Sequence, residues 1–240
     1  MPVPHKMPVS EPRTIADVEM KMLHGELRVH DLRLERCVFD NAGAHGTVAQ
    51  RVEVVDCSVW SCVLDDVVIE DCTVHNLKTS LGGGGKRIPF FLNGVFARHL
   101  TLSGTIGSVI WNPPRADGIQ ASAPAVAAAR RYYAAVDWAL DVSEARFRSV
   151  PSLRFGPPGR LIRRDPETQP LITRVQAALA LHAAGRDIGV WRVVLEDFVE
   201  SAWPDEIVLL PPLGARKAQR EEDLAGLAQL RSIGACDASP

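Results

Sequence analysis

A repetition of five residues constrains the fold of this chain more than any other feature of its sequence. Cut from Leu27, the chain gives eleven consecutive pentads in one phase: LRVHD, LRLER, CVFDN, AGAHG, TVAQR, VEVVD, CSVWS, CVLDD, VVIED, CTVHN and LKTSL. No first or third position carries a charge, and the other positions hold every charge of the segment. Because a helix repeats every 3.6 residues and a half-buried strand every two, the pattern is neither. It indicates a chain that turns every five residues, with positions one and three buried by stacking of successive turns.

These pentads resemble the pentapeptide-repeat family, whose loose consensus puts a small residue first and Leu or Phe third, as in CVFDN and CVLDD. The resemblance implies a mainly β fold: a right-handed β-solenoid, or quadrilateral β-helix, with four pentads in each coil. Residues twenty apart should then stack, with Cys57 over Cys37 and Cys72 over Val52. Stacked strands lie about 4.7–4.9 Å apart, so a Cys37–Cys57 disulfide is compatible with the spacing. Small apolar thiols also suit the first position, and we expect these cysteines to be buried and reduced.

The rest of the chain suggests a division into three parts. We expect an N-terminal segment over residues 1–24, a solenoid over 25–155 with insertions at 80–94 and 113–138, and a connection with a small α-helical C-terminal cap over 156–240. Four consecutive glycines interrupt the first run of pentads, and Pro113–Pro114 ends a second run. An alanine-rich helix should begin after Ser122, with Pro124 in its first turn. Between and after these insertions the five-residue phase predicts inward positions at Val95, Ala97, Leu100, Leu102, Thr105, Gly107 and Ile110, and then at Leu140, Val142, Ala145, Phe147 and Val150.

Helical periodicity governs the C-terminal part. One amphipathic face should hold Leu171, Val175, Ala178, Leu179 and His182, and a second Trp191, Val194, Leu195, Phe198 and Ala202. Both faces need a partner surface, and the open end of the solenoid is the nearest candidate, because an uncapped end exposes unpaired backbone groups. A last helix, roughly Arg216 to Ile233, carries Leu224, Leu227, Leu230 and Ile233, which could dock within the chain or pair two copies. In the family resembled, C-terminal helices often carry a dimer interface, so a homodimer through this helix is a further expectation.

The overall charge is nearly balanced, with 27 Lys and Arg against 29 Asp and Glu. This balance gives no electrostatic reason for direct nucleic-acid binding or for attachment to an anionic membrane. The sequence also lacks a long apolar run and a leader-like N-terminus, which favours a cytoplasmic protein.

Motifs for chemistry are absent from the sequence. The histidines and cysteines lack metal-binding spacings, so we predict neither a metal site nor a cofactor. The absence of catalytic motifs favours a protein that is not an enzyme. The Gly-rich stretch that ends in Lys86 fails the phosphate-loop pattern, because Arg87 stands where Ser or Thr is required. Stacking could pair His45 with Asp65 and Asp66, and His30 with Glu70 and Asp71, either for acid–base work or as solvated surface pairs.

Three classes of function follow from these observations. The first is a non-catalytic binding or scaffold protein whose flat faces recognise a macromolecular partner, most simply a protein, with Trp60 and Trp111 as surface contacts. The second is a small-molecule-binding protein or enzyme with a pocket where the Gly-rich loop, residues 111–114 and the Arg-rich connection meet, using Lys86, Arg87, Arg163 and Arg164.

The third class is a purely structural or immunity-type protein with a cognate protein partner. The family resembled also implies a narrower version of the first class, because some of its members mimic duplex DNA and protect a type II topoisomerase. Mimicry requires a strongly acidic rod. The eleven pentads carry five basic and nine acidic residues, a net charge of 5 − 9 = −4. The basic residues are interspersed among the acidic ones, so the sequence gives this alternative less support than the first two.

Overall fold

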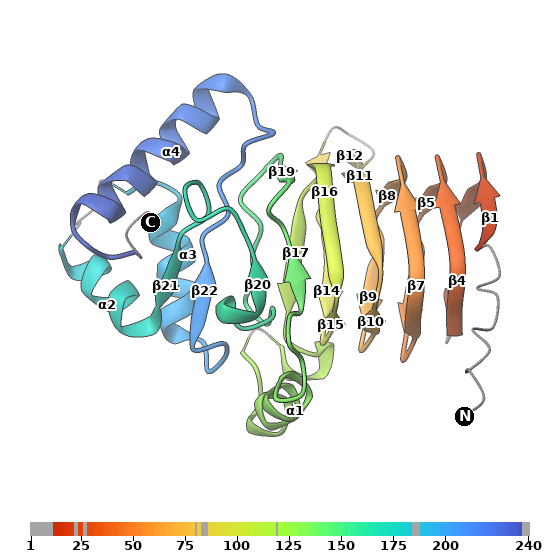
Figure 1. Ribbon diagram of the computed structural model, residues 1–240, viewed down its shortest axis with the longest axis horizontal. Helices are drawn as coiled ribbons and strands as arrows, with labels where there is room; N and C mark the ends of the chain where they lie inside the picture. The colour runs from red at the N-terminus through yellow and green to blue at the C-terminus, as the bar shows by residue number, and fades with distance from the viewer. Residues whose placement is uncertain are drawn as a thin grey trace, which may run out of the picture.

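The computed structural model describes residues 12–21, 24–25, 28–79, 81–82, 86–118, 120–183 and 188–236. The chain is rich in β-strand, with parallel strands in large sheets, and helices gather at the C-terminal end (Figure 1). In the described residues, the only antiparallel pairs are β12 (Leu81–Gly82) with β13 (Lys86–Arg87) and β21 (Leu171–Thr173) with β22 (Glu206–Val208). No described helix has both the length and the apolar composition needed to cross a membrane.

The parallel strands lie on four faces, and the chain visits each face once per layer. The first face holds the beginnings of β4 (Arg28–Glu35) and β7 (Val48–Val55), then β10 (Val68–Glu70) and β15 (Phe96–Arg98). The second holds β1 (Arg13–Ala16), the ends of β4 and β7, β11 (Thr73–Thr79), β16 (Leu100–Ile106), β18 (Leu140–Asp141) and β20 (Ile162–Arg163). The third holds β2 (Glu19–Lys21), β5 (Val38–Asp40), β8 (Ser58–Trp60), the ends of β11 and β16, and β19 (Ala145–Phe147). The fourth holds β3 (His24–Gly25), β6 (Gly43–His45), β9 (Val63–Asp65), β14 (Phe90–Asn93) and β17 (Val109–Asn112). We call this stack of strands the layered body.

Residues twenty apart pair across the layers, as the pentads predict. Val29 lies beside Ala49 and Phe39 beside Val59 in the register of the sheets. The Cys37 amide donates to Cys57 Sγ at 3.3 Å, and the Val52 amide donates to Cys72 Sγ at 3.4 Å. The four cysteines of the pentads are buried and form no disulfide, so the expectation of separate thiols is confirmed.

The fifth residue of ten successive pentads takes a left-handed backbone conformation, which the pattern of inward positions does not predict. Its φ lies between +49° and +58° at ten successive pentad ends. Only glycine adopts this region without cost, and Asn and Asp tolerate it better than other residues. Positive φ turns the chain after three extended residues, and these three, the corner residue and the first-position residue after it make up the repeat of five. The ten positions are Asp31, Arg36, Asn41, Gly46, Arg51, Asp56, Ser61, Asp66, Asp71 and Asn76.

Insertions change the spacing but not the stacking. Strand β14 follows the Gly-rich insertion, so pairs such as Thr73 with Thr101 are 28 residues apart. Layer pairing also extends beyond the expected limits of 25 and 155. It begins at Arg13, opposite Leu32, and it ends at Arg163, opposite Asp141.

The predicted phase of the second run of pentads holds only as far as Leu102. One extra residue lies between Ser103 and Ile106, opposite β11, and shifts the register by one. Downstream of it, Ile106, Val109 and Trp111 become the buried positions, and Ile110 turns outward. Trp111 is therefore 1 % exposed, and its prediction as a surface contact is wrong. In the third run, Leu140, Val142, Ala145 and Phe147 are buried in the layered body as predicted, whereas Val150 packs against the C-terminal helices.

The second insertion forms a short helix, η1 (Arg115–Asp117), and α1 (Ala123–Tyr133). Helix α1 begins as predicted: the Ser122 hydroxyl accepts from the Ala125 amide at 3.3 Å, with proline in the first turn. It covers the first face at Phe96, whose ring stacks on Tyr132 with centroids 5.0 Å apart.

The C-terminal part contains η2 (Gly159–Leu161), α2 (Arg174–Ala183), α3 (Trp191–Glu200) and α4 (Lys217–Ser232). The predicted face of α3 is largely confirmed, because Trp191, Leu195 and Phe198 are buried. The predicted face of α2 is wrong: Val175 is 71 % exposed and Leu179 is 64 % exposed. The helix begins after β21 and buries its small residues Ala177 and Ala180 instead, which lets it lie close to α3.

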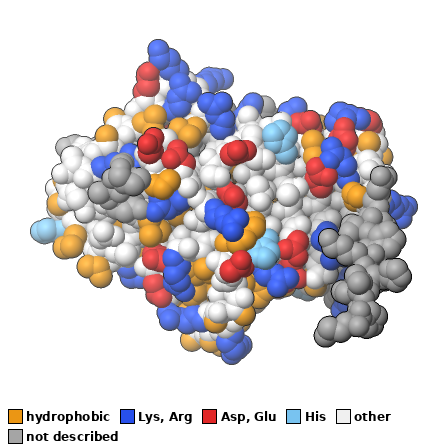
Figure 2. Space-filling view, in the orientation of Figure 1, with side chains coloured by type: hydrophobic (Ala, Val, Ile, Leu, Met, Phe, Trp, Pro, Cys, Tyr) orange, Lys and Arg blue, Asp and Glu red, His pale blue; other side chains and the backbone are white. Residues whose placement is uncertain are grey.

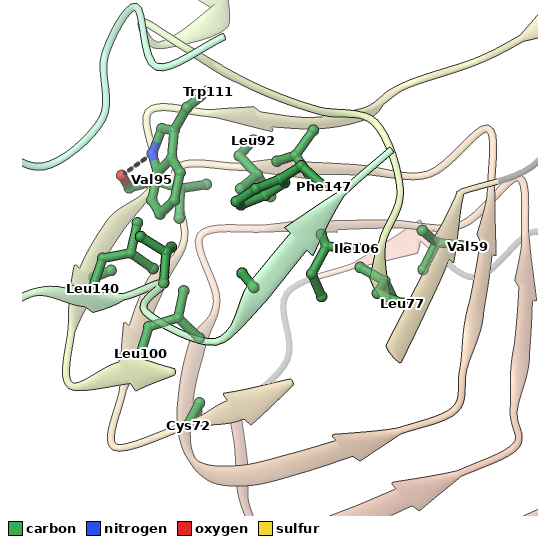
Figure 3. Packing of buried hydrophobic residues seen from close by; sticks show 14 of the residues in the cluster. Val59, Cys72, Leu77, Leu92, Val95, Leu100, Ile106, Trp111, Leu140 and Phe147 are labelled. Atoms are coloured by element: carbon green, nitrogen blue, oxygen red, sulfur yellow. Dashed lines mark hydrogen bonds between the residues drawn. The ribbon is translucent and has the colours of Figure 1, made fainter. Parts of the chain in front are cut away.

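Strand β22 and the residues after it join two cores. Val208 and Leu210 belong to the core of the layered body, whereas Ile207 and Leu209 belong to the core between the helices. Figure 3 shows the interior of the layered body, with Leu140 and Phe147 in the same cluster of buried residues as Leu92 and Ile106.

The leucines of the last helix pack within the chain. Leu227 and Leu230 are fully buried in the helical core, and Leu224 packs against it. Ile233, by contrast, is exposed. Leu224, Leu227 and Leu230, which were expected either to dock within the chain or to pair two copies, therefore make contacts within the chain. The homodimer itself stays a prediction.

The left-handed corners predict a specific response to substitution at Asn41, an exposed residue at φ +49°. Asn41→Val should lower the free energy of unfolding by about 1–2 kcal/mol, because a β-branched residue is strained at positive φ. Asn41→Gly should change it by less than about 0.5 kcal/mol, because glycine adopts this conformation freely. Chemical denaturation measures both, and equal stability of the two variants would contradict a left-handed corner at this position.

Candidate functional site

Among the described residues, no strand pairing and no cavity lining brings the four predicted ligand residues together. Arg163 lies on β20 beside Asp141, and the Arg164 guanidinium donates to the Gln169 carbonyl at 3.0 Å. Lys86 and Arg87 form β13, which among the described residues pairs with β12 and not with the sheet of β20. The side chains of Lys86 and Arg87 lie outside the described part of the chain.

Arg163 instead belongs to a stack of three planar groups. Its guanidinium lies 4.0 Å from the centroid of the Trp138 ring. The His99 ring also stacks on the Trp138 ring, with the two ring centroids 4.6 Å apart and the two ring planes 29° from parallel. Cations stack favourably on indole faces, so the arrangement is a stable surface feature that unites β20, the segment after α1, and the corner before β16.

His99 holds two carboxylates, one on each ring nitrogen. Its Nδ1 lies 2.7 Å from Asp71 Oδ1, and its Nε2 lies 2.7 Å from Asp137 Oδ1. The hydrogen bonds to Asp137 and Asp71 raise the pKa of His99, and the bond from His99 lowers the pKa of Asp137. The charged imidazolium, which donates from both nitrogens, is therefore the favoured form.

This geometry suits a clamp better than a proton-transfer catalyst. With both nitrogens bound to carboxylates, the ring offers no free nitrogen to a substrate. Asp71 belongs to the pentads and Asp137 to the segment after α1, so His99 ties the insertion to the layered body.

Stacking brings the expected residues together, with His45 beside Asp65 and both His30 and Glu70 beside Gln50, but the hydrogen bonds of His30 and Glu70 go to other partners. His30 Nδ1 lies 2.9 Å from Asp31 Oδ2, and the Glu70 carboxylate accepts from Gln50 at 2.7 Å. His45 lies beside Asp65 in the sheet register, where Asp65 accepts from Asn93 at 2.7 Å. The twenty-residue stacking rule does not predict the contacts of His99, because this residue follows the first insertion, where stacked residues are 28 apart.

Charges along the corners of the layered body neutralise one another. Arg51 donates two hydrogen bonds to Asp31, at 2.5 and 2.8 Å, and Arg36 donates two to Asp17, both at 2.7 Å. Acidic and basic side chains are interspersed over the surface in the same way (Figure 2). The surface therefore presents no extended field of one sign in this view.

Trp60 is the exposed aromatic residue that the sequence singled out, and it lies on the third face. It is 38 % exposed, beside Asp40 in the register of β5 and β8, and Asp40 in turn lies beside Lys21 of β2. Helix α1 lies over Phe96 on the first face and so does not shelter Trp60. An accessible indole between a flat strand surface and charged neighbours has the composition of a contact hot spot.

A cavity of about 240 Å³ lies where the layered body meets α3 and β22. Its walls are mainly apolar and include Ile110, Leu153, Val194, Phe198 and Leu209. The ion pair between Arg154 and Asp197, with Nη2 and Oδ2 2.6 Å apart, lies between this cavity and a smaller neighbouring one. The cavity lining contains no residue of the Arg-rich connection at 160–174 and none of the four predicted ligand residues.

Within the described residues, no group of three or more His, Cys, Asp and Glu side chains is arranged to hold a metal ion. Comparison with known proteins adds no assignment, because no family model, no curated protein and no solved structure matches the chain. The resemblance carried by the pentads therefore stays a prediction.

The clamp predicts a pH-dependent stability. Because the pKa of His99 is raised in the folded chain, its contribution should be fully present below its unfolded pKa of about 6.5 and lost as pH rises through the folded value. His99→Asn keeps a residue that tolerates positive φ but does not titrate. The difference in unfolding free energy between wild type and His99→Asn should shrink from pH 6 to pH 9, and a constant difference would contradict the clamp.

Proposed function

We propose that the layered body is a right-handed β-solenoid of the pentapeptide-repeat type. Three observations support this proposal: the twenty-residue register, the burial of first positions, and the positive φ at every fifth residue. All three are consequences of a chain that turns four times in each layer. A crystal structure that gave left-handed coils, or a different number of faces, would overturn the proposal.

We further propose that the protein is a non-catalytic binding or scaffold protein that recognises a protein partner with its strand faces. The observation that carries this is Trp60, an indole exposed on a flat face. A buried aromatic anchor supplies much of the binding energy of a typical protein interface. Lys21 and Asp40 in the same row would provide the polar rim.

The charge pattern favours a protein over nucleic acid as the partner, and it also weighs against mimicry of DNA. Both nucleic-acid binding and mimicry require long surfaces of one sign. The corner rows instead alternate, as in Arg51 with Asp31 and Arg36 with Asp17, so their fields cancel at short range.

The unpaired thiols of the pentads are consistent with a reducing compartment, and we propose the cytoplasm. Burial raises the pKa of Cys57, Cys62 and Cys72, which keeps these thiols protonated and unreactive.

Substitution of Trp60 tests the binding proposal. In co-purification from the native cell at low salt, Trp60→Ala should weaken capture of a stoichiometric protein partner at least tenfold, because it removes the anchor. The melting temperature should change little, because Trp60 is already accessible to solvent.

Leu179→Ala is the matched control, because Leu179 is also an exposed apolar side chain but lies on α2. It should leave capture unchanged. Loss of capture with Leu179→Ala and not with Trp60→Ala would move the interface to the helical part and contradict the role of the strand face.

A second candidate function is small-molecule binding in the junction cavity, which is favoured by its apolar walls and the adjacent Arg154–Asp197 pair. Its test is substitution of Val194, whose side chain lines the cavity. If native mass spectrometry of the purified protein finds a bound metabolite, Val194→Phe should displace it, and retention of the metabolite would reject this site.

A further inference from the structure

The interior of the layered body contains a second cavity, of about 290 Å³. It extends through four successive layers, from Val29 and Phe39 near one end to Trp111 near the other. At about 4.8 Å between layers, these positions span roughly 14 Å along the stack. The cavity is therefore elongated along the axis of the body and is not confined to one layer.

The exposure of the inward side chains independently indicates this space. First-position residues such as Cys37, Cys57 and Cys62 are buried, whereas third-position residues such as Leu34, Val54 and Ile69 are only partly buried. Both sets point inward, and Leu34, Val54 and Ile69 all line the cavity. Their accessible surface must then face the interior, because the backbone of the layers separates them from bulk water.

Small third-position residues create the cavity. Ala44 and Ala49 stand where the neighbouring layers place Leu64 and Val29, and both alanines line the space. Side chains across a coil cannot fill the volume that these alanines leave, because the sheet register fixes the distance between opposite faces.

The cavity walls are suited to a hydrocarbon and not to water. Aliphatic side chains dominate the lining, and Thr47, the polar side chain among them, donates its hydroxyl hydrogen to the His45 carbonyl. A buried water needs two to four polar partners, which such walls do not offer. An empty space, in turn, loses dispersion contacts along its whole surface.

The cavity ends before the layer that follows β16. Leu140 and Phe147 are buried in the layer that follows β16, opposite Leu100 and Ile106, and they do not line the cavity (Figure 3). Beyond the other end, Ile15 and Met20 of the first layer pack against the same core and do not line the cavity. An elongated apolar space of this length fits an unbranched hydrocarbon chain that lies along the axis of the body.

We propose that the interior of the layered body binds one unbranched alkyl chain, the tail of a fatty acid or of a lipid. This inference rests on the interior of the body and is independent of the outer faces that the proposed function uses.

Dodecanoate is the probe, and isothermal titration calorimetry is the measurement. The wild-type chain should bind one dodecanoate and melt at a higher temperature in its presence. Ala49→Leu should fill the cavity, weaken dodecanoate binding at least tenfold, and leave the melting temperature of the ligand-free protein equal or higher. Ala127→Leu makes the same change on the exposed side of α1 and should bind as wild type does.

Three results would overturn the proposal. Wild type could fail to bind dodecanoate up to its solubility limit, or Ala49→Leu could bind it normally, which would place the chain elsewhere. Ala49→Leu could also lower the melting temperature by several degrees, which would show an interior that is already filled. Xenon-129 NMR of the wild type tests the cavity without any substitution: a shifted bound signal supports the space, and no shift rejects it.

Dodecylphosphocholine distinguishes the two sources of the alkyl chain. Binding of both probes supports the proposal and assigns a lipid tail whose head group stays outside. Binding of dodecanoate alone supports it and assigns a free fatty acid.

Discussion

The backbone takes positive φ at every fifth residue from Asp31 to Asn76, and the layered body depends on this local turn. Each such residue other than glycine, asparagine or aspartate costs of the order of 1–2 kcal/mol relative to ordinary backbone geometry. The cost is offset because the turn directs two side chains of each pentad into a common interior. It also places the corner side chains in rows, where Arg51 reaches Asp31 and His99 reaches Asp71. Burial, stacking and the surface ion pairs all follow from that one backbone constraint.

Much of the layered body could be predicted from the sequence, because the pattern that encodes it is local. Inward positions repeat in one phase, and twenty-residue pairing such as Phe39 with Val59 follows from four pentads per layer. The prediction lost accuracy where non-local contacts decide the register. One extra residue after Ser103 buries Trp111, and nothing in the five-residue phase announces it. The predicted buried face of helix α2 is wrong for a related reason. The periodicity of the sequence cannot show that small alanines, and not Val175, pack against α3.

The candidate sites were harder to predict than the fold. Trp60 could be identified because its position in an unbroken pentad fixes an outward direction. The clamp at His99 required the length of an insertion to be known, since its partners come from a pentad 28 residues earlier and from a segment beyond α1. The charge of Arg163 suggests that it binds a ligand, but in the structure its guanidinium stacks on the Trp138 ring. Residue type alone cannot distinguish these uses.

The alternating side chains of residues 207–210 have a consequence for how the protein unfolds. Ile207 and Leu209 face the helical core, while Val208 and Leu210 face the layered core, so one short segment is shared by both. If the helices separated from the layered body, apolar residues of the last layer would become exposed to solvent at the same time. Repeat stacks can fray layer by layer from an uncovered end. Here, loss of the terminal layer is coupled to loss of the helices, so the two regions should melt in a single cooperative transition from this end.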